Sequence, residues 1–182
     1  MKRIETALPG VCIFEPREFR DSRGFFMETW NSRTLASLGV ELPFVQDNHS
    51  HSAQGVLRGL HYQLVQAQGK LLRVVAGAAY DVAVDIRRSS PNFGRWVGVE
   101  LSAENRRELW VPPGFAHGFL SLTDGTDFLY KCTDYYAPEH ERCILWSDPA
   151  LAIDWPLANI GSPQLAPRDA AAPTLATAEV YA

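Results

Sequence analysis

The sequence is poor in the residues that mark several common classes of protein. Its three cysteines, Cys12, Cys132 and Cys143, are odd in number and far apart, which speaks against a disulfide framework or a zinc site. No apolar run reaches the roughly 18 residues of a membrane-spanning helix. Residues 1–6 lack the apolar core of a secretory signal. We therefore expect a cytoplasmic protein that neither spans a membrane nor depends on disulfides.

Basic charge is also scarce. The chain has 17 Lys and Arg against 21 Asp and Glu, a net charge of −4, so we expect neither a nucleic-acid surface nor an anionic membrane as partner. Any bound anion must be held by a local cluster of basic groups. The length of 182 residues and the 46% hydrophobic fraction predict a single domain with a substantial core over residues 1–182. Residues from about 160 to 182 are rich in Pro and Ala, and we expect an irregular C-terminal arm there.

Short alternating segments broken by turn residues predict a mainly β fold. Apolar residues occupy every second position from Tyr80 to Ile86, namely Tyr80, Val82, Val84 and Ile86. This alternation predicts one buried face of a strand. Further strands are predicted over residues 71–75, 96–101, 108–111, 115–122, 127–135 and 143–147. Helix is expected only from a Ser32 cap to about Leu38 before Gly39, and in one turn after Ser102. Many short antiparallel strands indicate a sandwich or barrel.

The segments 55–63 and 68–70 carry unusual polar chemistry for strands that will be half buried. Strict alternation would point Arg58 and His61 to opposite faces, but a bulge at Gly59 would re-aim one of them. His61 is either a buried structural histidine or a general base. Lys70 is either a solvated edge residue or a cation facing a developing oxyanion.

Other candidates lie further along the chain. Tyr130 is either a core tyrosine or a proton donor that faces a histidine across a cavity. A Pro- and Gly-rich turn delivers His117 to the start of a strand.

His49 and His51 share a strand face and, with His61 or His117, form the best candidate for a divalent metal site. No acidic residue follows this pair at metal-ligand spacing, so we expect no metal. Residues 21–28 are also consistent with a hairpin that carries a surface ion pair.

Several blocks, taken in order, resemble the dTDP-4-dehydrorhamnose 3,5-epimerases. The blocks are Arg23-Gly24-Phe25-Phe26-x-Glu28, Gln46-Asp47-Asn48-His49-Ser50, Val56 to Gln63, Gln68-Gly69-Lys70, Asp81 to Arg87, Pro113 to Phe119, Tyr130-Lys131-x-Thr133-Asp134-Tyr135-Tyr136 and Pro167-Arg168-Asp169-Ala170. The resemblance implies a cupin-like jelly roll (double-stranded β-helix) with a few short helices, and a homodimer without cofactor or metal. It also implies conversion of dTDP-4-dehydro-6-deoxy-D-glucose to dTDP-4-dehydro-L-rhamnose. This is a step of dTDP-L-rhamnose biosynthesis, which serves lipopolysaccharide or other cell-surface polysaccharides.

The same resemblance assigns roles to individual residues. It implies that His61 is the base, that Asp169 orients it, that Tyr130 is the acid on the opposite face, and that Lys70 stabilises the enolate. Substrate contacts are expected from Lys70 and from Arg23, Phe26, Glu28, Gln46, Asp47, Asn48, Arg58, His117, Tyr136, Glu141 and Arg168. A dimer would let a neighbouring subunit complete the site.

Three alternatives remain open at the level of sequence. The first is an epimerase that acts at one carbon only, in a related dTDP-4-keto-deoxysugar pathway. The second is a metal-dependent cupin enzyme. The third is a non-catalytic sugar-binding module, which the joint presence of His61, Tyr130 and Lys70 argues against.

Overall fold

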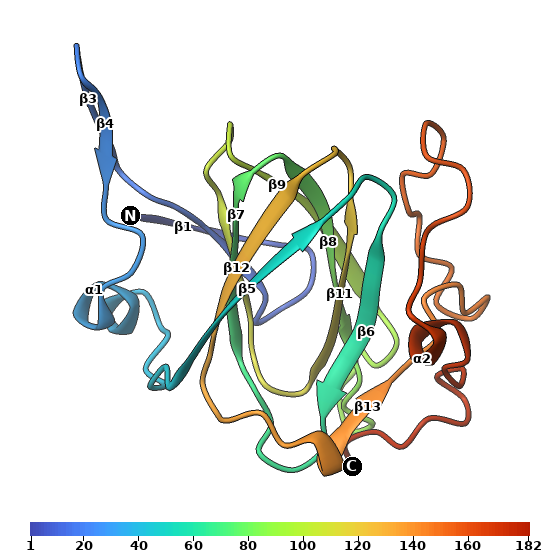
Figure 1. The fold of residues 1–182 in the computed structure, drawn as a ribbon. Coiled ribbons are helices and arrows are strands. Elements are labelled where there is room, and N and C mark those ends of the chain that lie inside the picture. The colour runs from blue at the N-terminus through green and yellow to red at the C-terminus, as the bar shows by residue number, and fades with distance from the viewer.

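The computed structural model describes residues 1–182 and consists of two packed antiparallel sheets with little helix (Figure 1). The six-stranded sheet has the order β1 (Lys2–Glu5), β2 (Cys12–Glu15), β10 (Glu108–Val111), β7 (Lys70–Ala76), β12 (Thr126–Cys132) and β5 (Gln46–Ser52). The five-stranded sheet has the order β13 (Glu141–Cys143), β6 (Leu57–Gln63), β11 (Phe115–Ser121), β8 (Ala78–Asp85) and β9 (Trp96–Ser102). The predicted mainly β, cupin-like jelly roll is confirmed.

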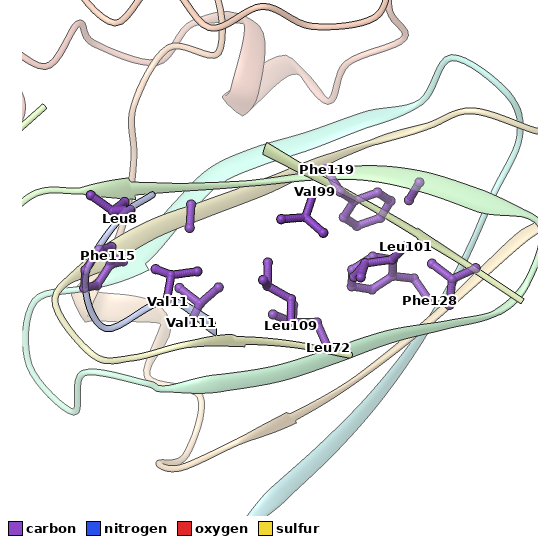
Figure 2. Close-up of a cluster of buried hydrophobic side chains, with 13 residues drawn as sticks. Leu8, Val11, Leu72, Val99, Leu101, Leu109, Val111, Phe115, Phe119 and Phe128 are labelled. Atoms are coloured by element: carbon purple, nitrogen blue, oxygen red, sulfur yellow. The ribbon is translucent and has the colours of Figure 1, made fainter. Parts of the chain in front are cut away.

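A cluster of 13 buried hydrophobic residues fills the space between the two sheets (Figure 2). Leu72, Leu109 and Phe128 enter it from the six-stranded sheet, while Leu101 and Phe119 enter from the other sheet. The rings of Phe119 and Phe128 stack with centroids 4.3 Å apart. Stacked aromatic rings and close-packed aliphatic groups fix the separation of the sheets, and with it the width of any cavity between them.

The chain after β13 covers the outer face of the five-stranded sheet. Leu151, Trp155 and Leu175 pack against Val82 and Val84, so the predicted face of residues 80–86 is buried beneath this segment. The segment, orange to red in Figure 1, contains the four-residue helix α2 (Pro167–Ala170), which the sequence did not predict. The strand predicted over 143–147 ends at Cys143 because the chain turns there to meet the arm.

Helix α1 (Ser32–Ser37) packs on the outer face of the six-stranded sheet, where Leu35 contacts the cluster containing Phe14 and Trp110. Its N-cap is Asn31, whose side chain accepts hydrogen bonds from the amides of residues 33 and 34, so the predicted Ser32 cap is wrong by one residue. The turn expected after Ser102 is present: the Arg106 amide donates to the Ser102 carbonyl, and the Asn105 amide donates to the Ser102 hydroxyl. No helix combines the length and apolar character needed to cross a membrane.

The strands β3 (Glu18–Asp21) and β4 (Gly24–Met27) form a hairpin that projects away from both sheets (Figure 1). Asp21 accepts a hydrogen bond from the Arg23 amide and pairs with its guanidinium. The Phe19, Phe25 and Phe26 side chains on this hairpin are exposed, Phe26 by 69%. Such exposed aromatic residues on a projecting element are typical of a protein-contact surface.

Candidate active site

A cavity of about 620 Å³ lies between the two sheets, at the end where the C-terminal arm meets β6. Both sheets and the arm contribute to its wall. The predicted site residues that line it are Gln46, Asn48, Arg58, His61, Lys70, His117, Tyr130, Tyr136, Glu141, Arg168 and Asp169. Residues separated by more than a hundred positions in the chain therefore meet around one space.

A bulge in β6 brings Arg58 and His61 to the same cavity. Against β11, His61 pairs with His117 but Arg58 pairs with Phe119, so β6 holds one extra residue between these positions. The backbone of Gly59 has φ +131°, and a Cβ there would lie 2.5 Å from the Cα of Gly118. Only glycine fits this close approach, and the bulge predicted at this position is confirmed.

His61 and Asp169 form a hydrogen-bonded pair. The His61 Nε2 lies 2.7 Å from Asp169 Oδ1, and the Gly59 amide donates to Asp169 Oδ2 at 3.2 Å. Burial acts to raise the pKa of Asp169, but the bonds from His61 and Gly59 outweigh it and hold the pKa below its usual value. Because an ionised carboxylate only accepts hydrogen bonds, Nε2 carries the proton. The Nδ1 nitrogen has no hydrogen bond to the protein and is available as a base.

Tyr130 and Lys70 reach the cavity from the opposite sheet. They lie on β12 and β7, which are hydrogen-bonded neighbours, whereas His61 lies on β6. Burial raises the pKa of Tyr130, so its hydroxyl keeps its proton at neutral pH. Lys70 is 9% exposed and its ammonium has no hydrogen bond to the protein, although burial lowers its pKa. A cation held in this way is available to a negative oxygen in the cavity.

A second histidine–aspartate pair lies next to the first. His117 Nε2 is 3.0 and 2.9 Å from the two carboxylate oxygens of Asp81, and both side chains are buried. These residues come from the adjacent strands β11 and β8. The pair presents a fixed imidazole to the cavity without any contribution from the arm.

At the rim, charged and polar groups form a connected set. Arg168 donates to Glu141 through its two terminal nitrogens, Nη1 and Nη2, and the Tyr136 hydroxyl donates to Glu141 at 2.8 Å. The backbone amide of Tyr136 donates to Gln46 at 2.9 Å. Arg58 and Arg168 both line the cavity, and their guanidinium groups suit an anionic group such as a diphosphate.

Comparisons with known proteins agree with this arrangement. The family model described as dTDP-4-dehydrorhamnose 3,5-epimerase matches residues 5–177. A relative of that name from Pseudomonas aeruginosa is 56% identical over 182 residues, covering 100% of this chain and 99% of its own. A crystal structure of the 3,5-epimerase from Legionella pneumophila, in complex with dTDP-4-keto-L-rhamnose, has a TM-score of 0.95 and 54% identity, covering 98% of this chain and 94% of that one.

The chain belongs to the dTDP-4-dehydrorhamnose 3,5-epimerase family. It is thus an enzyme of the isomerase class that acts on a dTDP-linked sugar, as the sequence resemblance predicts.

Four residues predicted as substrate contacts of this epimerase lie outside its own cavity. Asp47 points to the outer face of β5, where it binds Lys131 at 2.8 Å, because only Gln46 and Asn48 share the inward parity. Arg23 and Phe26 are exposed on the projecting hairpin. Glu28 lies just after the hairpin and binds Asn31 before α1. None of these four lines the cavity of its own chain, and their role as substrate contacts stays a prediction.

The alternative metal site also fails on geometry. His49 and His51 lie on the exposed face of β5, where both rings contact Asp127 at 3.0 and 2.9 Å. The same alternation that directs Asn48 and Ser50 into the cavity directs these two rings away from it. They therefore cannot join His61 or His117 around one ion.

Sequence reasoning missed several residues of the cavity wall. Phe119 shares its strand parity with His117, a signal that could have identified it as part of the wall. Gln164 and Leu165 enter from the arm, and no local pattern indicates their approach to β6. Behind this wall lies Asp81, which the sequence named only as part of a resembling block, because its partner His117 is 36 positions away.

Proposed function

We propose that this epimerase converts dTDP-4-dehydro-6-deoxy-D-glucose to dTDP-4-dehydro-L-rhamnose by removing ring protons at carbons 3 and 5 and returning protons from the opposite face. One observation carries the proposal: His61 and Tyr130 line a single cavity from opposite sheets. The product-like ligand of the Legionella relative supports the same substrate class. Inversion at carbon needs a base and an acid on opposite faces of the ring, because return of a proton to the original face regenerates the substrate.

His61 is the base in this mechanism. Its Nδ1 takes the proton, and Asp169, hydrogen-bonded to Nε2 at 2.7 Å, orients the ring and stabilises the imidazolium that forms. Carbons 3 and 5 both flank the carbonyl at carbon 4, so the same base serves both positions after a small movement of the ring. An imidazole is the side chain best suited to proton transfer near neutral pH.

Lys70 stabilises the enolate. Loss of either proton places negative charge on the oxygen at carbon 4, and an ammonium with no protein partner interacts more strongly with that oxyanion than with the neutral ketone. Such differential interaction lowers the barrier rather than merely tightening binding.

Tyr130 supplies the proton from the other face. Its raised pKa keeps the phenol protonated until the carbanion forms. Replacement of Tyr130 by Phe removes the donor and leaves His61, Asp169 and Lys70 in place. The variant should still exchange substrate ring protons with solvent while it loses inversion, by ~10²–10⁴-fold for a positioned acid.

The deciding experiment is incubation with the 4-keto sugar nucleotide in heavy water, followed by proton NMR. Deuterium at both carbons together with the L-rhamno product supports the proposal. Deuterium at one carbon indicates a mono-epimerase, and none indicates a binding module. Loss of turnover on treatment with a chelator indicates a metal-dependent enzyme. Normal epimerisation by the Tyr130→Phe variant contradicts the assigned donor.

The proposal extends to the nucleotide. Arg58 and Arg168 bind the diphosphate, and Tyr136, which is 53% exposed at the rim, stacks with the thymine. The polar wall formed by Gln46 and Asn48 accounts for further contacts. Three free thiols, all buried, are consistent with the cytoplasmic location that we propose.

We also propose a homodimer in which the hairpin of each subunit completes the site of the other. The hairpin carries Arg23 and Phe26 with exposed side chains, far from any role in its own cavity. Mixed variants test this: His61→Ala and Arg23→Ala, each inactive or weak alone, should regain activity when refolded together. One site of the mixed dimer then holds both intact groups. A monomer in analytical ultracentrifugation, or no recovery on mixing, contradicts the proposal.

A further inference from the structure

Three side chains that can bind a metal lie close together, and the proposed mechanism does not use all three of them. His61, Cys143 and Asp169 each offer one ligand atom, and these three atoms all lie within 4.8 Å of one another. The pairing of β13 with β6 places Cys143 directly opposite His61, and its thiol is 3.7 Å from Asp169 Oδ1. The proposed epimerisation uses the histidine and the aspartate and gives the cysteine no task.

We propose that these three side chains form an inhibitory site for a thiophilic divalent cation such as Zn²⁺. Nitrogen, thiolate and carboxylate are the ligands that Zn²⁺ takes in proteins, and three protein ligands with one open position are a common arrangement. Ligand atoms around a tetrahedral Zn²⁺ lie about 3.3–3.8 Å apart at ordinary bond lengths. The His61–Asp169 separation is 2.7 Å, the Cys143–Asp169 separation is 3.7 Å, and all three ligand atoms lie within 4.8 Å of one another, so small side-chain movements bring them to this spacing.

A cation can approach the cluster from two sides. The substrate cavity borders His61 and Asp169, and a second cavity of about 320 Å³ borders Cys143 on the other side of Arg168. Although Cys143 is only 8% exposed, the second cavity reaches it, whereas Cys12 and Cys132 are fully buried. The remaining coordination position would be filled by water.

Arg168 opposes the cation and sets the strength of the site. Its Nη2 is 3.2 Å from His61 Nε2, and its Nε is 3.7 Å from Asp169 Oδ1. Glu141 already binds the Arg168 guanidinium through two nitrogens. It can therefore retain this guanidinium when Arg168 moves away from His61 and Asp169. Binding therefore exchanges one cation for another, with release of the thiol proton.

Inhibition follows from the tautomer of His61, and this half of the inference rests on the proposed function. A metal can bind Nε2 only when that nitrogen carries no proton, because the metal occupies the Nε2 lone pair. The neutral imidazole then carries its one proton on Nδ1. Nδ1 is the atom that accepts the substrate proton. An imidazole bound in this way cannot act as a base, so Zn²⁺ should abolish turnover without blocking the nucleotide subsite.

The test measures metal binding and inhibition separately. Metal-free protein, without substrate, is titrated with Zn²⁺ in a calorimeter and with Co²⁺ in a spectrophotometer. We expect one ion per chain and a thiolate-to-cobalt charge-transfer band. Cys143→Ser should lose the band and weaken Zn²⁺ binding at least ~10-fold, because a hydroxyl is a poor ligand. The matched controls Cys12→Ala and Cys132→Ala should retain both.

The second measurement is turnover as a function of Zn²⁺, normalised to each variant's own rate without metal. Cys143→Ser should need at least ~10-fold more Zn²⁺ for half-inhibition, and a chelator should restore the wild-type rate. A double variant, His49→Ala with His51→Ala, removes the exposed histidines and should change neither result. Unchanged Zn²⁺ binding by Cys143→Ser, or absence of the charge-transfer band in the wild type, overturns the inference. Turnover of the metal-free enzyme tests the proposed function independently.

Discussion

Two histidine–aspartate pairs each place an imidazole on the wall of the same cavity, but they are built differently. His117 and Asp81 come from adjacent strands, 36 positions apart, and both side chains are buried. His61 and Asp169 are 108 positions apart, and the aspartate enters on a short helix of the C-terminal arm. The sheet alone therefore fixes the first pair, whereas the second depends on the docking of the arm.

The difference separates a rigid part of the wall from a reactive one. Both carboxylate oxygens of Asp81 contact His117 Nε2, and these two contacts restrict rotation of the imidazole ring. Asp169 contacts His61 with one oxygen and the Gly59 amide with the other, and the His61 side chain is 25% exposed to the cavity. We therefore expect His117 to hold substrate and His61 to transfer protons.

The largest effect should come from the two histidines themselves. His61→Ala should lower kcat by ~10²–10⁴-fold while nucleotide binding changes little, because the base is lost and the wall remains. His117→Ala should act mainly on KM, by about 10–100-fold, as expected for a lost hydrogen bond to a charged group. Steady-state kinetics and calorimetry with dTDP check both. Equal kcat losses for the two variants would contradict the division of roles.

The aspartates sharpen the same comparison. In Asp169→Asn the amide can donate to Nε2, which moves the ring proton to Nδ1 and blocks the base. We expect a kcat loss of at least ~10²-fold that Asp169→Glu partly restores. Asp81→Asn should leave kcat within about tenfold and instead lower the melting temperature, because the buried carboxylate that contacts His117 is lost. The pair of thermal denaturation curves and rates distinguishes the two roles.

Local rules of sequence account for the rigid part of the site. Period-two alternation explains the faces of residues 80–86 and places Gln46 and Asn48 in the cavity. Applied strictly, the same alternation excludes Asp47 from the cavity wall. Asp47 was nevertheless predicted as a substrate contact, because it lies between Gln46 and Asn48 in one resembling block. A glycine at the one point where alternation failed indicated the bulge that joins Arg58 to His61.

The reactive part could not be obtained from local rules. Nothing near Asp169 in the sequence indicates that it meets β6, and only the family resemblance suggested it. The hairpin was predicted as such, but its distance from its own cavity depends on how the chain leaves the sandwich. The spacing of the cysteines spoke against a zinc site at Cys143, and only the register of β13 against β6 places this thiol beside the base.

Glu108 is a buried carboxylate without a histidine partner, and it shows how hydrogen bonds affect the pKa of a buried carboxylate. It is 1% exposed, neither oxygen has a hydrogen bond, and its closest cation is Arg73 at 3.8 Å. Burial raises the pKa of Glu108 to about 8, although Arg73 and Lys131 act to lower it. Asp169 is also buried, yet its pKa is lowered, and the difference is the hydrogen bonding around it.

This difference predicts a dependence of stability on pH. Between the ordinary glutamate pKa of 4.5 and about 8, the folded chain holds a proton on Glu108 that the unfolded chain has released. Unfolding becomes easier across this window as pH rises, because the folded state binds more protons. Urea denaturation of the wild type at pH 5.5 and 9 should show a loss of about 2–4 kcal/mol from this group. Glu108→Gln should remove that loss, and the exposed control Glu100→Gln should retain it. An unchanged pH dependence in Glu108→Gln would mean that this carboxylate is ionised in the fold, and that hydrogen bonding is not what separates it from Asp169.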